Sequence, residues 1–181
     1  MKKNLKEFIK NIIPVLLGVL IALWIDNWNE ARKDQDYIDN FYSSLMQEFR
    51  DTDKEISEKT PGQLALVDTL DVYLDNETIP LMNLISMGGG LSGPDIKLNY
   101  WKAISGSKIE LLDYEKLSIL SDIDDGKQFL NYKREKMMDF VYANLTATGA
   151  QEKMLLKFII MDYLNTQTKV QTDIQKILNE E

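Results

Sequence analysis

The segment Ile12–Ile25, IIPVLLGVLIALWI, contains no charged or strongly polar side chain. As a helix its fourteen residues rise roughly 21 Å, which is short of the roughly 30 Å hydrocarbon core of a bilayer. Extending the helix from Phe8 to Trp28 gives about 31 Å, with Lys10 able to reach one membrane interface while Trp24 and Trp28 suit the other. The segment therefore predicts a single membrane-spanning helix.

Charged residues on the two sides of this segment predict its orientation. Four lysines and one glutamate precede it, whereas acidic residues outnumber basic ones directly after it. Because positively charged flanks stay in the cytoplasm, we expect the N-terminus there. The chain then divides into a cytoplasmic tip with a transmembrane anchor, residues 1–27, and a helical periplasmic domain, residues 28–181.

A cleaved secretory signal shares the lysine-rich start and the apolar core, so it is the main alternative to an anchor. Signal cleavage needs a pair of small residues two apart after the core. Cutting after Ala22 would place Leu20 in the pair, and residues 24–28 offer no small side chain. We therefore favour a retained anchor, and a buried core helix is the other alternative.

Small residues recur at every fourth position of the anchor. Pro14, Gly18 and Ala22 share one helix face, and Asp26 continues it. Small residues at this spacing let transmembrane helices approach closely, so the face predicts packing against a partner helix. The alternative is that glycine and alanine are simply common in membrane helices.

The charge balance excludes some classes of partner. The chain has 21 basic and 29 acidic residues, and residues 1–25 hold four of the basic ones and one of the acidic ones. The remainder therefore has a net charge of −11. An acidic surface repels phosphate groups, which disfavours binding to nucleic acid or to anionic lipid.

The sequence contains no cysteine and no histidine. It therefore lacks the thiol nucleophile, the imidazole base and the preferred zinc ligands, and its outer domain has no disulfide. A disulfide-free domain outside the cytoplasm suits a bacterial periplasm. We expect a bacterial inner-membrane protein whose C-terminal domain is periplasmic.

A stripe of mostly apolar residues at alternating steps of three and four follows the anchor. Since no glycine or proline lies between Gly18 and Pro61, we expect one helix from about residue 5 to about residue 59, ended by Thr60-Pro61-Gly62. The stripe is either the core of the domain, which its breadth favours, or the seam of an oligomeric stalk. It consists of Trp28, Ala31, Gln35, Ile38, Tyr42, Leu45, Phe49, Thr52 and Ile56.

Residues 76–98 form a glycine-rich segment without clear periodicity, which is typical of a mobile region or a partner surface. Gly88, Gly90 and Gly93 match G-x-G-x-x-G, but no hydrophobic strand precedes them and Pro94 follows, so we interpret them as a flexible hinge. The segment also contains a candidate partner surface of apolar residues: Leu81, Met82, Leu84, Ile85 and Met87.

Helical periodicity predicts further helices at about residues 64–74, 100–105, 113–120, 125–145 and 150–178. The last is long enough to lie antiparallel to the first helix. We expect an all-α chain whose N-terminal transmembrane helix is continuous with a long helix of an extracytoplasmic antiparallel helical bundle.

The acidic residues at 122, 124 and 125, followed by Gly126, suggest a calcium loop, but their register does not match an EF-hand. We interpret them as a turn between two helices. No cofactor and no metal site are expected.

Two stretches carry a family resemblance. The first comprises Gly18, Leu20, Ile21, Ala22, Leu23, Ile25, Asn27, Trp28, Asn29 and Glu30. The second comprises Tyr100, Ile104, Ser105, Gly106, Ile109, Leu111, Leu112, Leu117 and Leu120. Together they resemble an uncharacterised family of single-pass inner-membrane proteins of Gram-negative bacteria, with an anchor of the GVLIALxIxNWNE type and a helical periplasmic domain. Asp26 departs from the polar amide often found there. The resemblance implies topology and no catalytic residues.

These features favour a noncatalytic, single-pass membrane subunit that binds other envelope proteins, or a second copy of itself, within a membrane complex. The alternative is a periplasmic ligand-sensing helical bundle that acts through a partner membrane helix. An enzyme is disfavoured because no pair of acids stands out from the solvated helix faces. We expect neither nucleic acid nor a small-molecule substrate as a partner.

Overall fold

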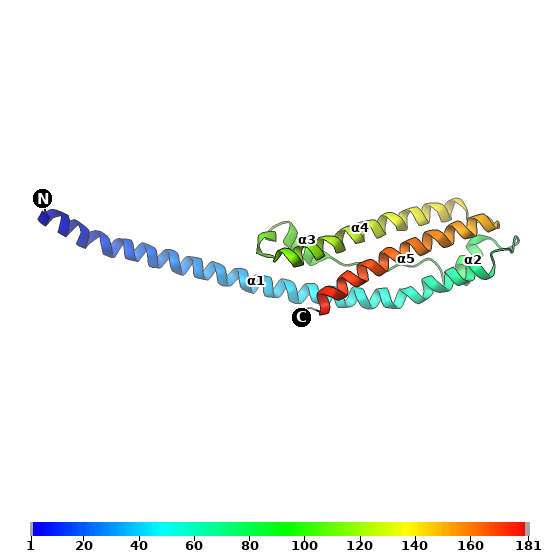
Figure 1. Cartoon of the computed structure of the whole chain (residues 1–181), viewed down its shortest axis with the longest axis horizontal. Coiled ribbons are helices and arrows are strands. Elements are labelled where there is room, and N and C mark those ends of the chain that lie inside the picture. The colour runs from blue at the N-terminus through cyan, green and yellow to red at the C-terminus, as the bar shows by residue number, and fades with distance from the viewer. Residues whose placement is uncertain (1, 180–181) are drawn as a thin grey trace. The chain divides into compact units, whose positions relative to one another are not determined.

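The computed structural model describes residues 2–179, with the side chains of residues 12–179. The described residues contain helices and no strand, which confirms the all-α prediction (Figure 1). The elements are α1 (Lys2–Val72), α2 (Leu81–Met87), α3 (Asn99–Ser105), the short 3-10 helix η1 (Ile109–Leu111), α4 (Tyr114–Ala143) and α5 (Ala150–Asn179).

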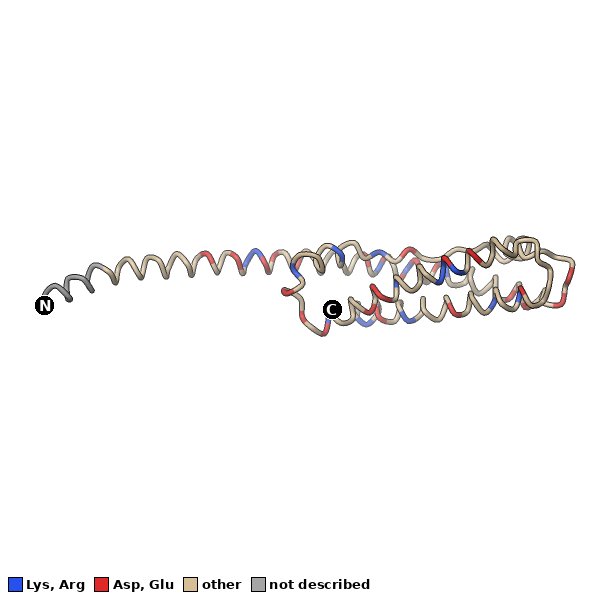
Figure 2. Tube along the Cα trace, turned by 90° about the horizontal axis from the view of Figure 1, so that it is seen from above, with Lys and Arg blue, Asp and Glu red and all other residues tan. Residues whose placement is uncertain are grey.

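The chain divides into two compact units, Met1–Ser43 and Ser44–Glu181, which we call the N-terminal unit and the C-terminal unit. The N-terminal unit consists of the first part of α1, and every side chain from residue 12 to residue 33 is exposed. Charged residues are absent from residues 12–25 and recur along the rest of the chain (Figure 2). Within residues 12–179, α1 is the one helix that is long and apolar enough to cross a membrane.

Three long helical segments make up most of the C-terminal unit: residues 44–72 of α1, α4 and α5. Helix α5 runs opposite to the other two (Figure 1). The side-chain hydrogen bonds agree, because Gln171 meets Asp53 near the start of this part of α1 whereas Lys157 meets Asp71 near its end. This arrangement brings one face of each helix into a shared interior.

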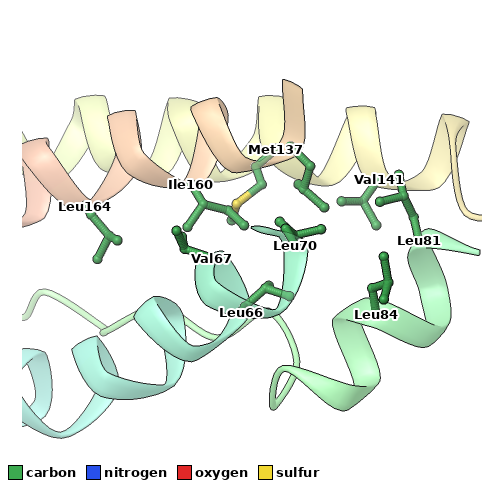
Figure 3. Close-up of a cluster of buried hydrophobic side chains, with 10 residues drawn as sticks. Leu66, Val67, Leu70, Leu81, Leu84, Met137, Val141, Ile160 and Leu164 are labelled. Carbon is green, nitrogen blue, oxygen red and sulfur yellow. The ribbon is translucent and has the colours of Figure 1, made fainter. Parts of the chain in front are cut away.

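The interior contains an apolar cluster to which four helices contribute. Side chains of α1, α2, α4 and α5 point toward one another there (Figure 3). Burial of each large aliphatic side chain contributes roughly 1.5–3 kcal/mol. The buried members are Leu66, Val67, Leu70, Leu81, Leu84, Met137, Val141, Leu156, Ile160 and Leu164.

The predicted stripe on α1 divides along its length. Trp28, Ala31 and Gln35 are exposed, whereas the later members from Leu45 to Ile56 are buried in the C-terminal unit. The interpretation as the core of the domain is therefore confirmed for this later part. The early part is open, so whether it pairs with another helix stays a prediction.

The predicted helix end at residues 60–62 is wrong, because α1 continues to Val72. Pro61 lacks the N–H that would bind the carbonyl four residues earlier. Packing on the C-terminal side compensates, since Gln63, Leu66 and Leu70 are buried on one face of the continuing helix. A local helix breaker is thus outweighed by burial of the following two turns.

The predicted turn at residues 122–126 is also wrong, because α4 runs without interruption from Tyr114 to Ala143. Gly126 lies within this helix, where a Cβ atom would come 2.5 Å from Cγ2 of Val170 on α5. The glycine therefore permits close approach of two helices and does not mark a turn. The predicted helices 100–105 and 150–178 are confirmed as α3 and α5.

The glycine-rich segment is more regular than expected. It contains α2, and its glycines have defined roles: a Cβ atom on Gly88 would lie 2.7 Å from Cα of Leu66, and Gly89 and Gly90 have φ values of +93° and +86°. These left-handed conformations suit glycine and reverse the chain after α2. The structure therefore assigns the glycines to close packing and a turn.

Replacing the helical glycines Gly62 and Gly126 by alanine should have opposite effects. Gly62 has open space around its Cα, so Gly62→Ala should raise the free energy of unfolding by about 0.5–1 kcal/mol through helix propensity. Gly126→Ala should lower it, because Val170 has a stiff β-branched side chain and overpacking costs about 1–3 kcal/mol. Urea titration of the full-length protein in detergent, followed by circular dichroism, measures both. A stabilised Gly126→Ala protein would contradict the close approach of α4 and α5.

Candidate functional site

The most distinctive surface of the chain is the apolar part of α1. Its large side chains are exposed on all sides of the helix, with relative exposures from 36% at Ile12 to 68% at Trp24. Soluble monomers rarely expose continuous apolar patches larger than a few hundred Å². A helix that is apolar all round requires apolar surroundings, which a bilayer supplies.

The residues predicted at the membrane interfaces lie at the two ends of this surface. Trp24 and Trp28 are both exposed, at 68% and 56%. An exposed indole combines a large apolar ring with an N–H donor, the combination found at membrane–water interfaces. The side chain of Lys10 lies outside the described residues.

The predicted packing face of the anchor carries no contact in the structure. Pro14, Gly18, Ala22 and Asp26 are exposed, and a Cβ atom on Gly18 would meet nothing within 4 Å. The face is therefore available to a partner helix. Its use stays a prediction.

The predicted partner surface in the glycine-rich segment needs correction. Leu81 and Leu84 are fully buried in the apolar cluster, and Ile85 packs against it, whereas Met82 and Met87 are 55% and 54% exposed. The segment forms the short helix α2, which turns Leu81 and Leu84 to the same side. Only the two methionines remain as candidate surface residues.

Helix α2 is fixed to the loop between α4 and α5 by its backbone. The N–H of Leu81 donates to the carbonyl of Ala147 over 2.9 Å, and the N–H of Met82 donates to that of Leu145 over 3.0 Å. Both donors belong to the first turn, whose N–H groups have no partner within the helix. The loop thus takes the place of a side-chain cap, and α2 is part of the folded unit.

Sequence reasoning missed a set of polar side chains that hold the chain as it returns from α2 along α1. Glu48, which is buried, accepts hydrogen bonds from the backbone N–H groups of Asn99 and Tyr100 at the start of α3. Gln63 donates to the carbonyl of Ser92, and Arg134 donates to that of Pro94 over 2.6 Å. Because these hydrogen bonds join residues that are far apart in the chain, no local sequence pattern predicts them.

A reciprocal amide pair joins the two antiparallel helices at mid-length. Gln63 and Gln167 donate to each other over 3.1 and 3.0 Å, and Gln167 also donates to the hydroxyl of Thr60. Both glutamines are buried. Buried amides cost free energy unless they are hydrogen bonded, so this pair favours one register of α5 on α1.

Lys153 is the least exposed charged residue among those described, at 0%. Its ammonium group donates to the carbonyls of Tyr73, at 2.9 Å, and Asn76, in the turn that ends α1. These carbonyls lie at the negative end of the helix dipole, where a cation is favourable. A buried lysine on α5 therefore caps α1.

An open groove lies between α4 and α5. It has a volume of about 490 Å³ and is bordered by acidic, aromatic and polar side chains. Its size falls within the range of small-molecule pockets. The lining residues are Asp122, Asp125, Gly126, Phe129, Thr166, Lys169 and Val170.

The described residues contain no group of three or more acidic side chains that could hold a metal ion. The acids at 122, 124 and 125 project from a continuous helix, and Asp124 accepts a hydrogen bond from Gln128. Hydrogen bonds from Lys136 to Asp139 and from Lys176 to Asp173 raise the pKa of both lysines, which stabilises their charged forms. The Lys136–Asp139 pair is exposed on both sides, whereas Asp173 is buried and its partner Lys176 is exposed.

Comparison with known proteins gives no relative. No family model, no curated protein and no solved structure matches the chain. The function must therefore be inferred from the surfaces described above.

Loss of the buried cap should destabilise the C-terminal unit. Lys153→Met keeps the aliphatic part of the side chain but removes the donor to the end of α1, and should lower the free energy of unfolding by about 1–3 kcal/mol. Lys157→Met, one turn later, removes only the half-exposed ion pair with Asp71 and should cost less than about 1 kcal/mol. Thermal unfolding of the full-length protein in detergent compares the two. Equal losses would show that the cap contributes no more than a surface pair.

Proposed function

We propose that the chain is a noncatalytic, single-pass membrane subunit that binds other envelope proteins as part of a membrane complex. The exposure of every large apolar side chain from Ile12 to Trp28 carries this proposal. The cost of leaving this surface in water is large, and a bilayer removes it. The N-terminus is cytoplasmic, in keeping with the lysines before the apolar segment and the acidic residues after it.

The C-terminal unit is, in this proposal, an antiparallel helical bundle in the periplasm that is continuous with the anchor. The bounds of α1, Lys2–Val72, support the continuity, and the opposed direction of α5 supports the bundle. Polar contacts between helices, without a cysteine in the chain, suit a compartment in which disulfides are not required. The unit then presents a rigid surface outside the inner membrane.

A binding role is favoured over catalysis by the kinds of side chain that are accessible. The chain has no histidine or cysteine. Among the buried charged groups, Glu48 and Lys153 are engaged with backbone atoms, and Asp173 accepts a hydrogen bond from Lys176. Exposed methionines such as Met82 and Met87 adapt to different partners because their side chains are flexible.

The alternative is a ligand sensor, which the groove between α4 and α5 favours. Phe129 and Thr166 border it on opposite helices. A small molecule bound there would bias the packing of the two helices and act through a partner of the anchor. A ligand that raises the unfolding temperature of the wild type but not of a Phe129→Ala variant would favour this second function.

A charge placed in the anchor should remove the protein from the membrane. Leu20→Arg should reduce the alkali-resistant membrane fraction, since a central arginine costs about 2.5–3.5 kcal/mol of insertion free energy. Leu64→Arg is a matched control on the same helix, because both leucines are exposed, at 60% and 45%. Alkaline extraction of membranes followed by immunoblotting gives the fractions. Wild-type protein that is fully released by alkali would contradict the anchor.

A protein partner should be retained through the exposed methionines of α2. Met82→Lys combined with Met87→Lys should reduce the yield of a co-purifying protein several-fold in mild detergent, without a change in unfolding temperature. Val72→Lys, at a 76% exposed apolar position near the end of α1, is the control. Unchanged co-purification would exclude these methionines from the interface.

A further inference from the structure

Helix α5 has a long exposed face without charge. Eight residues, separated in turn by three and four positions, lie on this face. All eight are exposed and uncharged, although 28% of the residues in the chain are charged. We call this face the α5 stripe. It consists of Gln151, Met154, Phe158, Met161, Asn165, Thr168, Thr172 and Gln175.

The exposed faces of the neighbouring helices differ. In the C-terminal unit, α4 exposes Asp125, Glu135 and Asp139, and α1 exposes Lys54 and Glu58 among other charges. Charged residues are the usual occupants of a solvated helix face. Their absence from all eight positions of the α5 stripe, while Asp162, Lys169 and Lys176 are exposed elsewhere on α5, indicates a face that is covered in the working protein.

The charges that border the apolar half of the stripe are paired within the chain. On one side Lys157 contacts Asp71, with 2.6 Å between Nζ and Oδ1. On the other side Lys133 contacts Asp162, with 2.7 Å between Nζ and Oδ2. The bordering lysines therefore need no opposite charge from whatever covers the stripe.

We propose that the α5 stripe is the contact between two copies of this chain, an inference that rests on the proposed membrane anchoring. Outside residues 1–25 the chain has a net charge of −11, so a second copy is repelled by most of the surface. An uncharged face avoids this repulsion. It is also self-complementary across a two-fold axis, because apolar, amide and hydroxyl groups each pair with their own kind.

The spacing of the stripe fits a two-helix seam. Alternation by three and four is the repeat that keeps one helix face against a parallel partner. In this repeat Asn165 occupies the same class of position as Phe158, and an asparagine at such a position fixes the register of dimers by pairing with its counterpart. Two copies inserted in one direction are related by an axis along the membrane normal, and identical residues meet where this axis passes through the stripe.

The apolar area of the stripe is too small to hold a dimer together without confinement of the two copies in a membrane. Its apolar part comprises Met154, Phe158 and Met161, with Leu155 beside them, at exposures of 58%, 68%, 39% and 45%. With roughly 200 Å² for a large side chain, these four expose on the order of 400 Å², about half of the 800 Å² that a stable interface buries per partner. Polar residues extend the contact, and confinement in a bilayer raises the effective concentration.

Cysteine cross-linking tests the contact, because the chain has no native cysteine. Asn165→Cys and Thr168→Cys lie on the stripe, and Asn131→Cys is the matched control at an exposed asparagine on α4. The full-length protein is oxidised in its native membranes and run on a non-reducing gel. Disulfide-linked dimers should form at least fivefold more at residues 165 and 168 than at residue 131. Equal yields at all three positions would overturn the proposal, as would adducts to a different protein only.

A charge on the stripe should weaken the cross-link without affecting the fold. In the Asn165→Cys background, Met154→Lys should reduce the dimer several-fold, whereas Met82→Lys should not, although the two methionines are 58% and 55% exposed. Alkaline extraction of the same membranes tests the membrane anchor separately from the α5 contact. Loss of the protein from the membrane contradicts the anchor, and a retained protein without cross-links contradicts the α5 contact alone.

Discussion

The folded chain leaves the apolar surface from Ile12 to Trp28 without any cover of its own. Side chains on every side of α1 are exposed there, so no rotation of the helix would hide them from water. A hydrophobic helix of this kind is stable only in a medium that is itself apolar. The surface lies within the N-terminal unit, whereas the C-terminal unit is held together by an apolar cluster of its own.

The C-terminal unit contains buried polar contacts as well as this apolar cluster. The chain crosses from α2 back to α3 in an extended form, and extended backbone leaves N–H and carbonyl groups without partners. Glu48, Gln63 and Arg134 supply those partners from the helices alongside. The distances fit: seven extended residues from Ser92 to Asn99 span about 23 Å, and the fifteen helical residues between their partners Gln63 and Glu48 span about 22 Å.

The sequence predicted helices best where periodicity stopped at a glycine, as at Gly106 after α3 and at Gly149 before α5. It failed where a residue has one local tendency and a different tertiary role. Pro61 and Gly126 have the lowest intrinsic helix propensities, yet both lie inside helices. The packing of α5 against α1 and α4 outweighs the free-energy cost of placing them there. Leu81 and Leu84 were expected on a surface, although their spacing of three matches a short helix with a buried side. The polar contacts of the segment between α2 and α3 join residues that are far apart in sequence, and no local sequence pattern can indicate such contacts.

The two uncovered surfaces of the chain differ in a way that separates their partners. The anchor is apolar all round, whereas the α5 stripe changes from methionine and phenylalanine in its first half to amide and hydroxyl side chains in its second. Hydrocarbon would leave those amides without hydrogen-bond partners, at a cost of several kcal/mol for each group. A helix of the same composition restores the partners and also covers the apolar half. Lipid therefore suits the first surface and protein the second, so the proposed contact through the stripe lies outside the bilayer core.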